Sequence, residues 1–300
     1  MFKGINAIEF SKRFQTNEDC YRYLMNLKWG NDFACSRCGC KESHKGKHFY
    51  YRRCKSCSYD ESVTANTVFH GVKIPMLKAF HMVFRITSKK KGMSTVELGT
   101  EVGVQQKTAW LFKRKVQAAM KKDKDDKLNG DVEADETLIG GHSKFKGRST
   151  ETKDALFVAV EILADGRTGN IALQHLETFT AEEIKYAIKD NITDKSSIKT
   201  DAFHSYKKLA KEMKNMTVHY SNKGASFEEL HKQIMQFKNW LRGTHHHCSS
   251  EYLFAYTSEY EYKFNNRNRR KNLFNDILVR MMHEIPHPYN YLKKLCAYNT

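Results

Sequence analysis

Two cysteine pairs, each with two residues between its members, constrain this chain more than any other feature. They are Cys35 with Cys38 and Cys54 with Cys57. Each pair fits a tight turn that directs two thiolates at one point, and two such turns make the tetrahedral cage that Zn²⁺ prefers. Residues 41–53 can form the hairpin that closes the cage. The pattern therefore predicts a structural zinc ion in an N-terminal zinc ribbon.

The cysteine pattern leaves other arrangements open. The two pairs would also suit two disulfides or four buried thiols, although a basic chain with no apolar signal core over Met1–Glu9 favours a reducing compartment. Cys40 lies beside the first pair and is a possible substitute ligand. The remaining cysteines have no partner pattern and are interpreted as ordinary thiols; they are Cys20, Cys248 and Cys296.

The charge of the chain points to a polyanionic partner. Its 300 residues carry a formal net charge of +17, and no apolar run approaches the roughly 20 residues that span a bilayer. A nucleic acid is the expected partner and a membrane is not. We therefore expect a cytoplasmic, nucleoid-associated protein that binds double-stranded DNA.

Helical spacing follows the ribbon. One helix is expected from Pro75 through Ile86, a short one after a Ser94 cap, and a longer one over Gln105–Met120, with Gly103 in the turn between the last two. The last helix carries Lys107, Lys113, Arg114 and Lys115. This arrangement is typical of a DNA-binding helix-turn-helix, and its alternative is a plain helical hairpin with a solvated basic face.

Beyond a charged linker the pattern changes to alternating strands and helices. Three strands are expected, followed by helix, strand, helix, strand and helix, which is the order of an RNase H-like α/β domain with C-terminal helices after it. Thr180 with Glu183, and Ser226 with Glu229, resemble capping boxes for two of these helices. The expected domains are residues 1–70 for the N-terminal segment and ribbon, 71–122 for the helix-turn-helix, 123–129 for the linker and 130–300 for the catalytic domain.

Two aspartates occupy the positions where such a domain performs chemistry. Asp135 lies on the first expected strand and Asp201 at the end of the fourth, and these strands are neighbours in the RNase H-like fold. Two carboxylates at that place can hold two divalent cations that act on a phosphodiester. Oxygen ligands with open water positions favour Mg²⁺ or Mn²⁺.

Several segments resemble the ISXO-like insertion-sequence transposases, DDE enzymes with an N-terminal zinc ribbon. The resemblance rests on Gly130–Gly141 and Thr200–Tyr206 as first and second catalytic motifs, on His231–His246 as the third, and on Tyr256–Arg267 as the helix that follows. The segment Met93–Trp110 is similar to the family's helix-turn-helix. The resemblance covers about residues 20 to 285, with the motifs in the family's order.

This resemblance implies a DNA transposase that cuts the inverted-repeat ends of its element and joins the 3′ ends to target DNA. It implies that Asp135 and Asp201 bind the catalytic metals, and that His231 and Lys238, seven residues apart on one helix face, fill the third motif. Glu228 and Glu229 are rivals for the third ligand. The expected DNA contacts are Lys107, Lys113, Arg114, Lys238, His246 and Arg267.

Two other functions are compatible with the same motifs. A regulator could keep the ribbon and helices without catalysis, and an RNase H-like nuclease could hydrolyse DNA without joining it. Joining two ends implies a homodimer or a larger assembly. Leu273, Ile277 and Met281 repeat at helical spacing and are expected to complete the core or a subunit contact.

Overall fold

The structure is a computed structural model that describes residues 1–30, 32–140, 153–220, 226–245 and 248–292. Within these residues the chain forms two compact units. The first unit comprises residues 1–120 together with 269–292, and the second comprises residues 121–268. The boundary after Met120 falls at the start of the charged segment that the sequence identifies as a linker.

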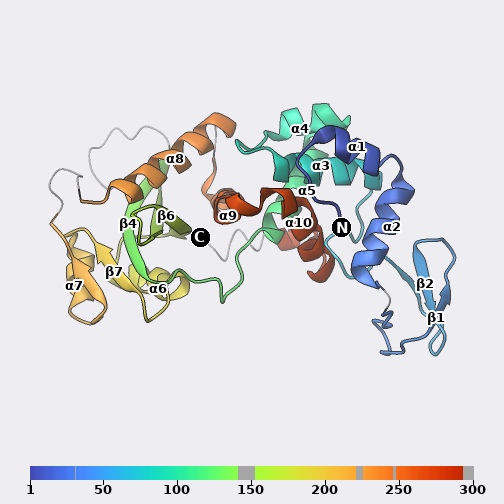
Figure 1. The fold of residues 1–300 in the computed structure, drawn as a ribbon, viewed down its shortest axis with the longest axis horizontal. Helices are drawn as coiled ribbons and strands as arrows, with labels where there is room; N and C mark the ends of the chain where they lie inside the picture. The colour runs from blue at the N-terminus through green and yellow to red at the C-terminus, as the bar shows by residue number, and fades with distance from the viewer. Residues whose placement is uncertain (31, 141–152, 221–225, 246–247, 293–300) are drawn as a thin grey trace. The chain divides into compact units, whose positions relative to one another are not determined.

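The first unit combines a small sheet with helices (Figure 1). The sheet has the order β1-β2-β3, and both pairs are antiparallel. The helices and strands of the first unit are α1 (Ala7–Arg13), α2 (Asn17–Lys28), β1 (Ser43–Lys45), β2 (Tyr51–Cys54), β3 (Asp60–Ser62), α3 (Met76–Ser88), α4 (Thr95–Val102), α5 (Gln106–Ala119) and α10 (Leu273–His283).

Phenylalanines form the centre of the helical part of this unit. Phe10 of α1 stacks on Phe84 of α3 with ring centroids 4.3 Å apart, and Phe274 of α10 meets both rings edge-on. The hydroxyl of Tyr23 donates to Asn275 over 2.6 Å, which ties α10 to α2. Helix α10 therefore completes the core of the first unit, whereas the sequence assigned residues 130–300 to one catalytic domain.

Helices α3, α4 and α5 confirm the three helices expected before the linker. The Ser94 hydroxyl accepts a hydrogen bond from the backbone N–H of Glu97, as its predicted role as N-cap requires. Gly103 ends α4 with a φ of 65°, a conformation that costs glycine little and turns the chain sharply into α5. The sharp turn between the two helices is thus built by a residue suited to it.

The second unit contains a five-stranded sheet with the order β6-β5-β4-β7-β8. Strands β4, β5 and β6 pair antiparallel, and β7 and β8 run parallel to β4. The elements are β4 (Asp131–Gly140), β5 (Lys153–Ile162), β6 (Thr168–Leu176), α6 (Ala181–Asn191), β7 (Ser197–Thr200), α7 (His204–Ala210), β8 (Met216–Val218), α8 (Glu228–Thr244) and α9 (Leu253–Asn265). Short 3₁₀ turns cover Ser250–Tyr252 and Arg267–Asn272. The expected element order is confirmed.

The central strand β5 separates two hydrophobic cores. Ala155, Phe157 and Ala159 pack with residues of α6 and α7. The alternate residues Leu156 and Val158 pack with α8 and α9. Because successive side chains of a strand point to opposite faces, α8 covers the face of the sheet opposite α6 and α7 (Figure 1).

Capping differs from the sequence prediction at two helices. Thr180 accepts from the N–H of Glu183 as expected, but the Glu183 carboxylate accepts from the backbone of Thr178 rather than closing a box. At α8 the N-cap residue is Phe227, which makes no side-chain cap hydrogen bond, and the Glu229 carboxylate binds Thr168 and Lys232. The capping box predicted for Ser226 and Glu229 is therefore wrong, because the helix begins one residue later and Glu229 is engaged by other side chains.

Side chains around the end of α9 cover the outer edge of β6. The amide of Asn265 accepts from the N–H of Ile171 and donates to its carbonyl, both over 2.9 Å. The Glu261 carboxylate accepts from Leu173, and Arg267 donates to the carbonyl of Thr168 over 2.7 Å. An edge strand has backbone N–H and C=O groups that no neighbouring strand pairs. The side chains described here bind these groups of β6 and so hinder a further strand from pairing with this edge of the sheet.

The buried Glu261 should make the stability of this unit depend on pH. Burial raises the pKa of Glu261 from 4.5 to about 7, so the native state retains a proton that the unfolded chain releases. The contribution of Glu261 to stability is then fully present below about pH 4.5 and is lost as the pH rises through about 7. We expect Glu261→Gln to raise the free energy of unfolding by roughly 1–3 kcal/mol at about pH 8 and to change it little at about pH 4.5. Urea unfolding at both pH values measures this, and an equal effect at both would contradict it.

Candidate active site and metal centre

The four predicted zinc ligands converge in the first unit. Their sulfur atoms all lie within 4.8 Å of one another, with Cys35 to Cys57 at 3.7 Å and Cys38 to Cys54 at 3.5 Å. A tetrahedral ion with Zn–S bonds of about 2.3 Å sets its sulfurs about 3.8 Å apart. The cluster therefore has the donor set and the spacing of a closed four-thiolate zinc site.

The other cysteine arrangements are not supported. The cysteines among the described residues are all free, and the Cys40 sulfur lies outside the cluster, 3.8 Å from the carbonyl of Glu42. Burial raises the pKa of Cys20 to about 12, as suits an inert core thiol. Cys296 lies outside the described residues.

The two predicted catalytic aspartates lie at the same level on neighbouring strands. Ala134 of β4 pairs with Thr200, the last residue of β7, in parallel register. Asp135 is the next residue of β4, and Asp201 directly follows the end of β7. Each carboxylate is anchored through Oδ1 by a backbone N–H, that of Glu136 for Asp135 over 2.8 Å and that of Phe203 for Asp201 over 2.9 Å. These hydrogen bonds fix the orientation of both carboxylates.

His231 faces this pair from α8. Its Nε2 lies 3.7 Å from Oδ2 of Asp135, and its side chain is 42% exposed. The rival Glu229 is engaged elsewhere, because its carboxylate accepts the Thr168 hydroxyl over 2.7 Å and pairs with Lys232. Glu228 is exposed at the start of the helix. Of the three side chains weighed for the third position, the described structure brings His231 to Asp135.

Lys238 lies two turns further along α8 and is half-buried. Burial lowers the pKa of Lys238, while the nearby charge of Asp135 raises it. The same face of β4 presents Glu133, whose pKa is raised by burial and opposed by Lys199. Among the described residues, the four cysteines are the only group of three or more potential metal ligands whose ligand atoms all lie within 4.8 Å of one another. The ligand atoms of Asp135, Asp201 and His231 are therefore spaced more widely than those of the zinc cluster.

The sequence gives no signal for a buried carboxylate beneath the aspartates. Glu136 follows Asp135 but points to the opposite face of β4, where it is 7% exposed and lies beside the phenol of Tyr206. Burial raises the pKa of Tyr206 well above its usual value, and the Glu136 carboxylate contributes to the rise. Only its position in a predicted strand, alternating away from Asp135, could have marked Glu136 as buried.

Two family models match the chain, and both cover residues described above. The model of the ISXO2-like transposase domain matches residues 127–265, which include both aspartates, His231 and Lys238. The model of the transposase zinc-ribbon domain matches residues 15–60, which include all four clustered cysteines. The chain thus carries a transposase zinc-ribbon domain followed by an ISXO2-like transposase domain. No curated protein gives a significant match to it.

A transposase is a DNA-processing enzyme, and the structure places its predicted DNA contacts in different environments. Lys107 is exposed in the first turn of α5. Lys113 is 1% exposed and donates to the carbonyl of Met93 over 2.7 Å, and Arg114 is buried and donates to Gln117. The prediction that Lys113 and Arg114 contact DNA is therefore not supported, because both are used within the protein.

The remaining predicted DNA contacts of the transposase lie in its second unit. Arg267 donates to the carbonyls of Phe264 and Thr168, so its guanidinium covers the edge of β6, and a DNA contact is not supported for it either. Lys238 is half-buried, which lowers its pKa, and it is close enough to Asp135 for that charge to raise the pKa. His246 lies outside the described residues. Among the described helices, none is both long and apolar enough to cross a membrane.

Proposed function

We propose that the protein binds the inverted-repeat ends of an insertion sequence, cleaves them and joins the 3′ ends to target DNA. The observation that carries this is the placement of Asp135 and Asp201 at equal height on adjacent parallel strands, with His231 facing Asp135. The strand order β6-β5-β4-β7-β8 supports an RNase H-like catalytic domain. Helices α4 and α5 support a DNA-binding helix-turn-helix, in which the exposed Lys107 begins the second helix.

The chain's own groups have distinct tasks in this reaction. Asp135 and Asp201 would hold two Mg²⁺ or Mn²⁺ ions, which supply an activated attacking oxygen and a stabilised leaving oxygen at the phosphodiester. The backbone N–H groups of Glu136 and Phe203 keep the two carboxylates oriented. His231 completes the oxygen-rich site with one nitrogen donor, and the Lys238 ammonium neutralises a phosphate of the bound strand.

A strand-transfer assay tests the proposal. The protein is incubated with duplexes that carry the element's ends, with Mg²⁺ or Mn²⁺ and a supercoiled target plasmid. Covalent joining of end to plasmid is expected. Cleavage without joining would identify a nuclease, and binding without cleavage would identify a regulator. Because two ends must be joined together, we also expect a homodimer or a larger assembly on DNA.

His231 should determine the metal preference. An imidazole brings no negative charge and is softer than a carboxylate, so it favours Mn²⁺ over Mg²⁺ more than a glutamate does. We expect His231→Ala to lose nearly all strand transfer, and His231→Glu to retain some with its preference moved towards Mg²⁺. The matched control is Glu228→Ala, three residues earlier and exposed, which should be nearly normal. If Glu228→Ala is inactive while His231→Ala has normal activity, the third ligand is Glu228 and not His231.

A further inference from the structure

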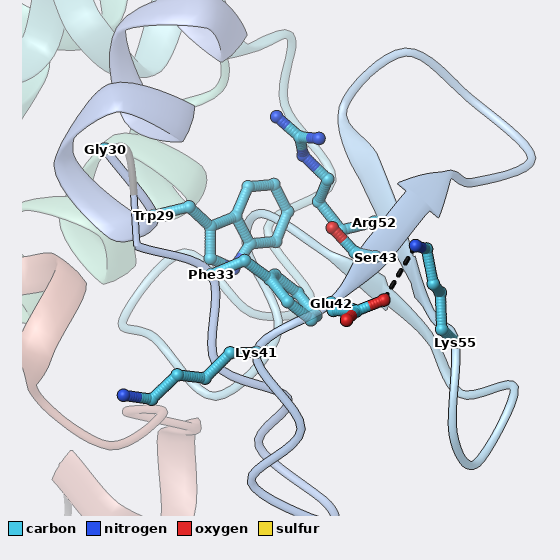
Figure 2. A pocket seen from close by; sticks show the side chains of 8 residues that line it. All are labelled: Trp29, Gly30, Phe33, Lys41, Glu42, Ser43, Arg52 and Lys55. Carbon is cyan, nitrogen blue, oxygen red and sulfur yellow. Dashed lines mark hydrogen bonds and ion pairs between the residues drawn. The ribbon is translucent and has the colours of Figure 1, made fainter.

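A pocket of about 300 Å³ lies in the first unit, between the residues that follow α2 and the ribbon hairpin. Trp29 and Phe33 contribute aromatic rings, while Arg52 and Lys55 come from the hairpin side (Figure 2). Lys41 also belongs to the lining. Nothing in the catalytic site or the zinc centre accounts for this pocket.

Two buried donors in this pocket have no acceptor. Trp29 is 6% exposed, and its indole Nε1 has no hydrogen-bond partner among the described residues. The Nε of Arg52 is also buried, and no partner is found for it in the described part of the chain. Leaving a buried donor without an acceptor is unfavourable. Both therefore suit a ligand that brings oxygen acceptors.

The carboxylates near the pocket are already paired. Glu42 forms an ion pair with Lys55 over 2.7 Å, and this contact lowers the pKa of Glu42. Glu61 lies opposite Arg52 in the strand register, yet it is bound to Lys28 over 2.8 Å. Neither acid is left to balance Arg52 and Lys41. The lining therefore carries positive charge and hydrogen-bond donors, which is the requirement for an anion.

We propose that this pocket binds a phosphate group of the DNA backbone. The Arg52 guanidinium and the Trp29 N–H donate to the phosphate oxygens, Lys41 adds charge at the rim, and the ring of Phe33 packs against the sugar. The inference rests on the proposed function for its source of phosphate. It adds a contact that fixes the ribbon on the duplex without reading bases, because phosphates carry no sequence information.

Inorganic phosphate tests the pocket without DNA. The chain has three tryptophans, so ¹⁵N-labelled protein should give three indole N–H signals, and Trp29→Phe assigns one of them. Titration with phosphate, against sodium chloride of equal ionic strength, should shift the Trp29 signal and leave those of Trp110 and Trp240 in place. An unmoved Trp29 signal, or equal shifts in all three, overturns the proposal. This result does not depend on whether the protein transposes.

Duplex DNA tests the natural source of the phosphate. Arg52→Gln should weaken binding equally for all sequences and lower the slope of log affinity against log salt by about 0.9, the value for one lost phosphate contact. Arg53→Gln is the matched control, because Arg53 is exposed on the same strand and its Nε donates to the Ser58 carbonyl rather than into the pocket. Equal slope losses for both variants would contradict a specific pocket. Zinc content checks that each ribbon is folded, and Lys41→Gln gives a second variant at an exposed position.

Discussion

Replacing Asp135 or Asp201 with asparagine should abolish cleavage and strand transfer while DNA binding stays nearly unchanged. Each substitution removes a negative charge from the place where two cations must be held. Losing a single electrostatic donor from a catalytic site already costs roughly 10²–10³ in rate, so we expect a fall of at least about 10³-fold. Cleavage of labelled element ends measures the loss, and a gel-shift assay measures the binding.

Both substitutions should remove the charge without disturbing the local backbone. Both aspartates use Oδ1 to accept a backbone N–H, from Glu136 and from Phe203. The amide oxygen of asparagine can accept the same bonds, so the local backbone should keep its shape. Asp131→Asn provides the matched control, since Asp131 is exposed on the same strand. Near-normal strand transfer by Asp135→Asn or Asp201→Asn would exclude the proposed metal site.

The five-stranded sheet was predictable because its strands differ in their patterns of polar and apolar residues, and a single sequence displays such patterns. β5 carries apolar residues on both faces, as a central strand must, and β4 alternates between Val132 or Ala134 and the polar Glu133 or Asp135. Once the strand order was expected, the proximity of Asp135 and Asp201 followed from it. The parallel register of Ala134 with Thr200 places them as that order requires.

Other features depend on contacts between segments that lie far apart in the sequence. A basic helix residue is normally solvated, so nothing local indicates that Lys113 is buried against Met93. Ser226 and Glu229 have the spacing of a capping box, yet the N-cap residue is Phe227 and the Thr168 hydroxyl donates to Glu229. Local spacing shows which bonds a segment can make by itself, but not which distant residue competes for them.

Helix α10 illustrates the same limit for domain boundaries. Its apolar residues at helical spacing predicted a buried helix correctly, but the spacing does not say which core it enters. The partner surface is a cluster of rings that includes Phe10 and Phe84, more than 180 residues earlier in the chain. Because that surface is assembled only on folding, the sequence placed α10 with its neighbours in the chain rather than with the first unit.

The second large effect is expected at the zinc centre, where Cys54→Ser should leave the ribbon unfolded. A structural zinc ion contributes about 10–16 kcal/mol to a small domain of this kind. Serine offers no thiolate, and even the loss of an outer-shell partner lowers metal affinity by 10–100-fold. We expect purified Cys54→Ser protein to hold far less than one zinc ion per chain, as measured by elemental analysis.

Limited proteolysis of the full-length Cys54→Ser protein should then show which residues unfold with the ribbon and which stay folded. Cleavage is expected within residues 35–60, while the second unit, residues 121–268, stays resistant because its two cores contain no cysteine from the ribbon. Cys40→Ser is the matched control, since the Cys40 sulfur lies outside the cluster and is hydrogen-bonded to the Glu42 carbonyl. A full complement of zinc in Cys54→Ser together with its loss in Cys40→Ser would identify Cys40 as the fourth ligand.

Because Arg52 lies two residues before Cys54 on β2, loss of the metal should also remove the response of the Trp29 indole signal to phosphate. Zinc binding and phosphate binding are therefore expected to be lost together in Cys54→Ser.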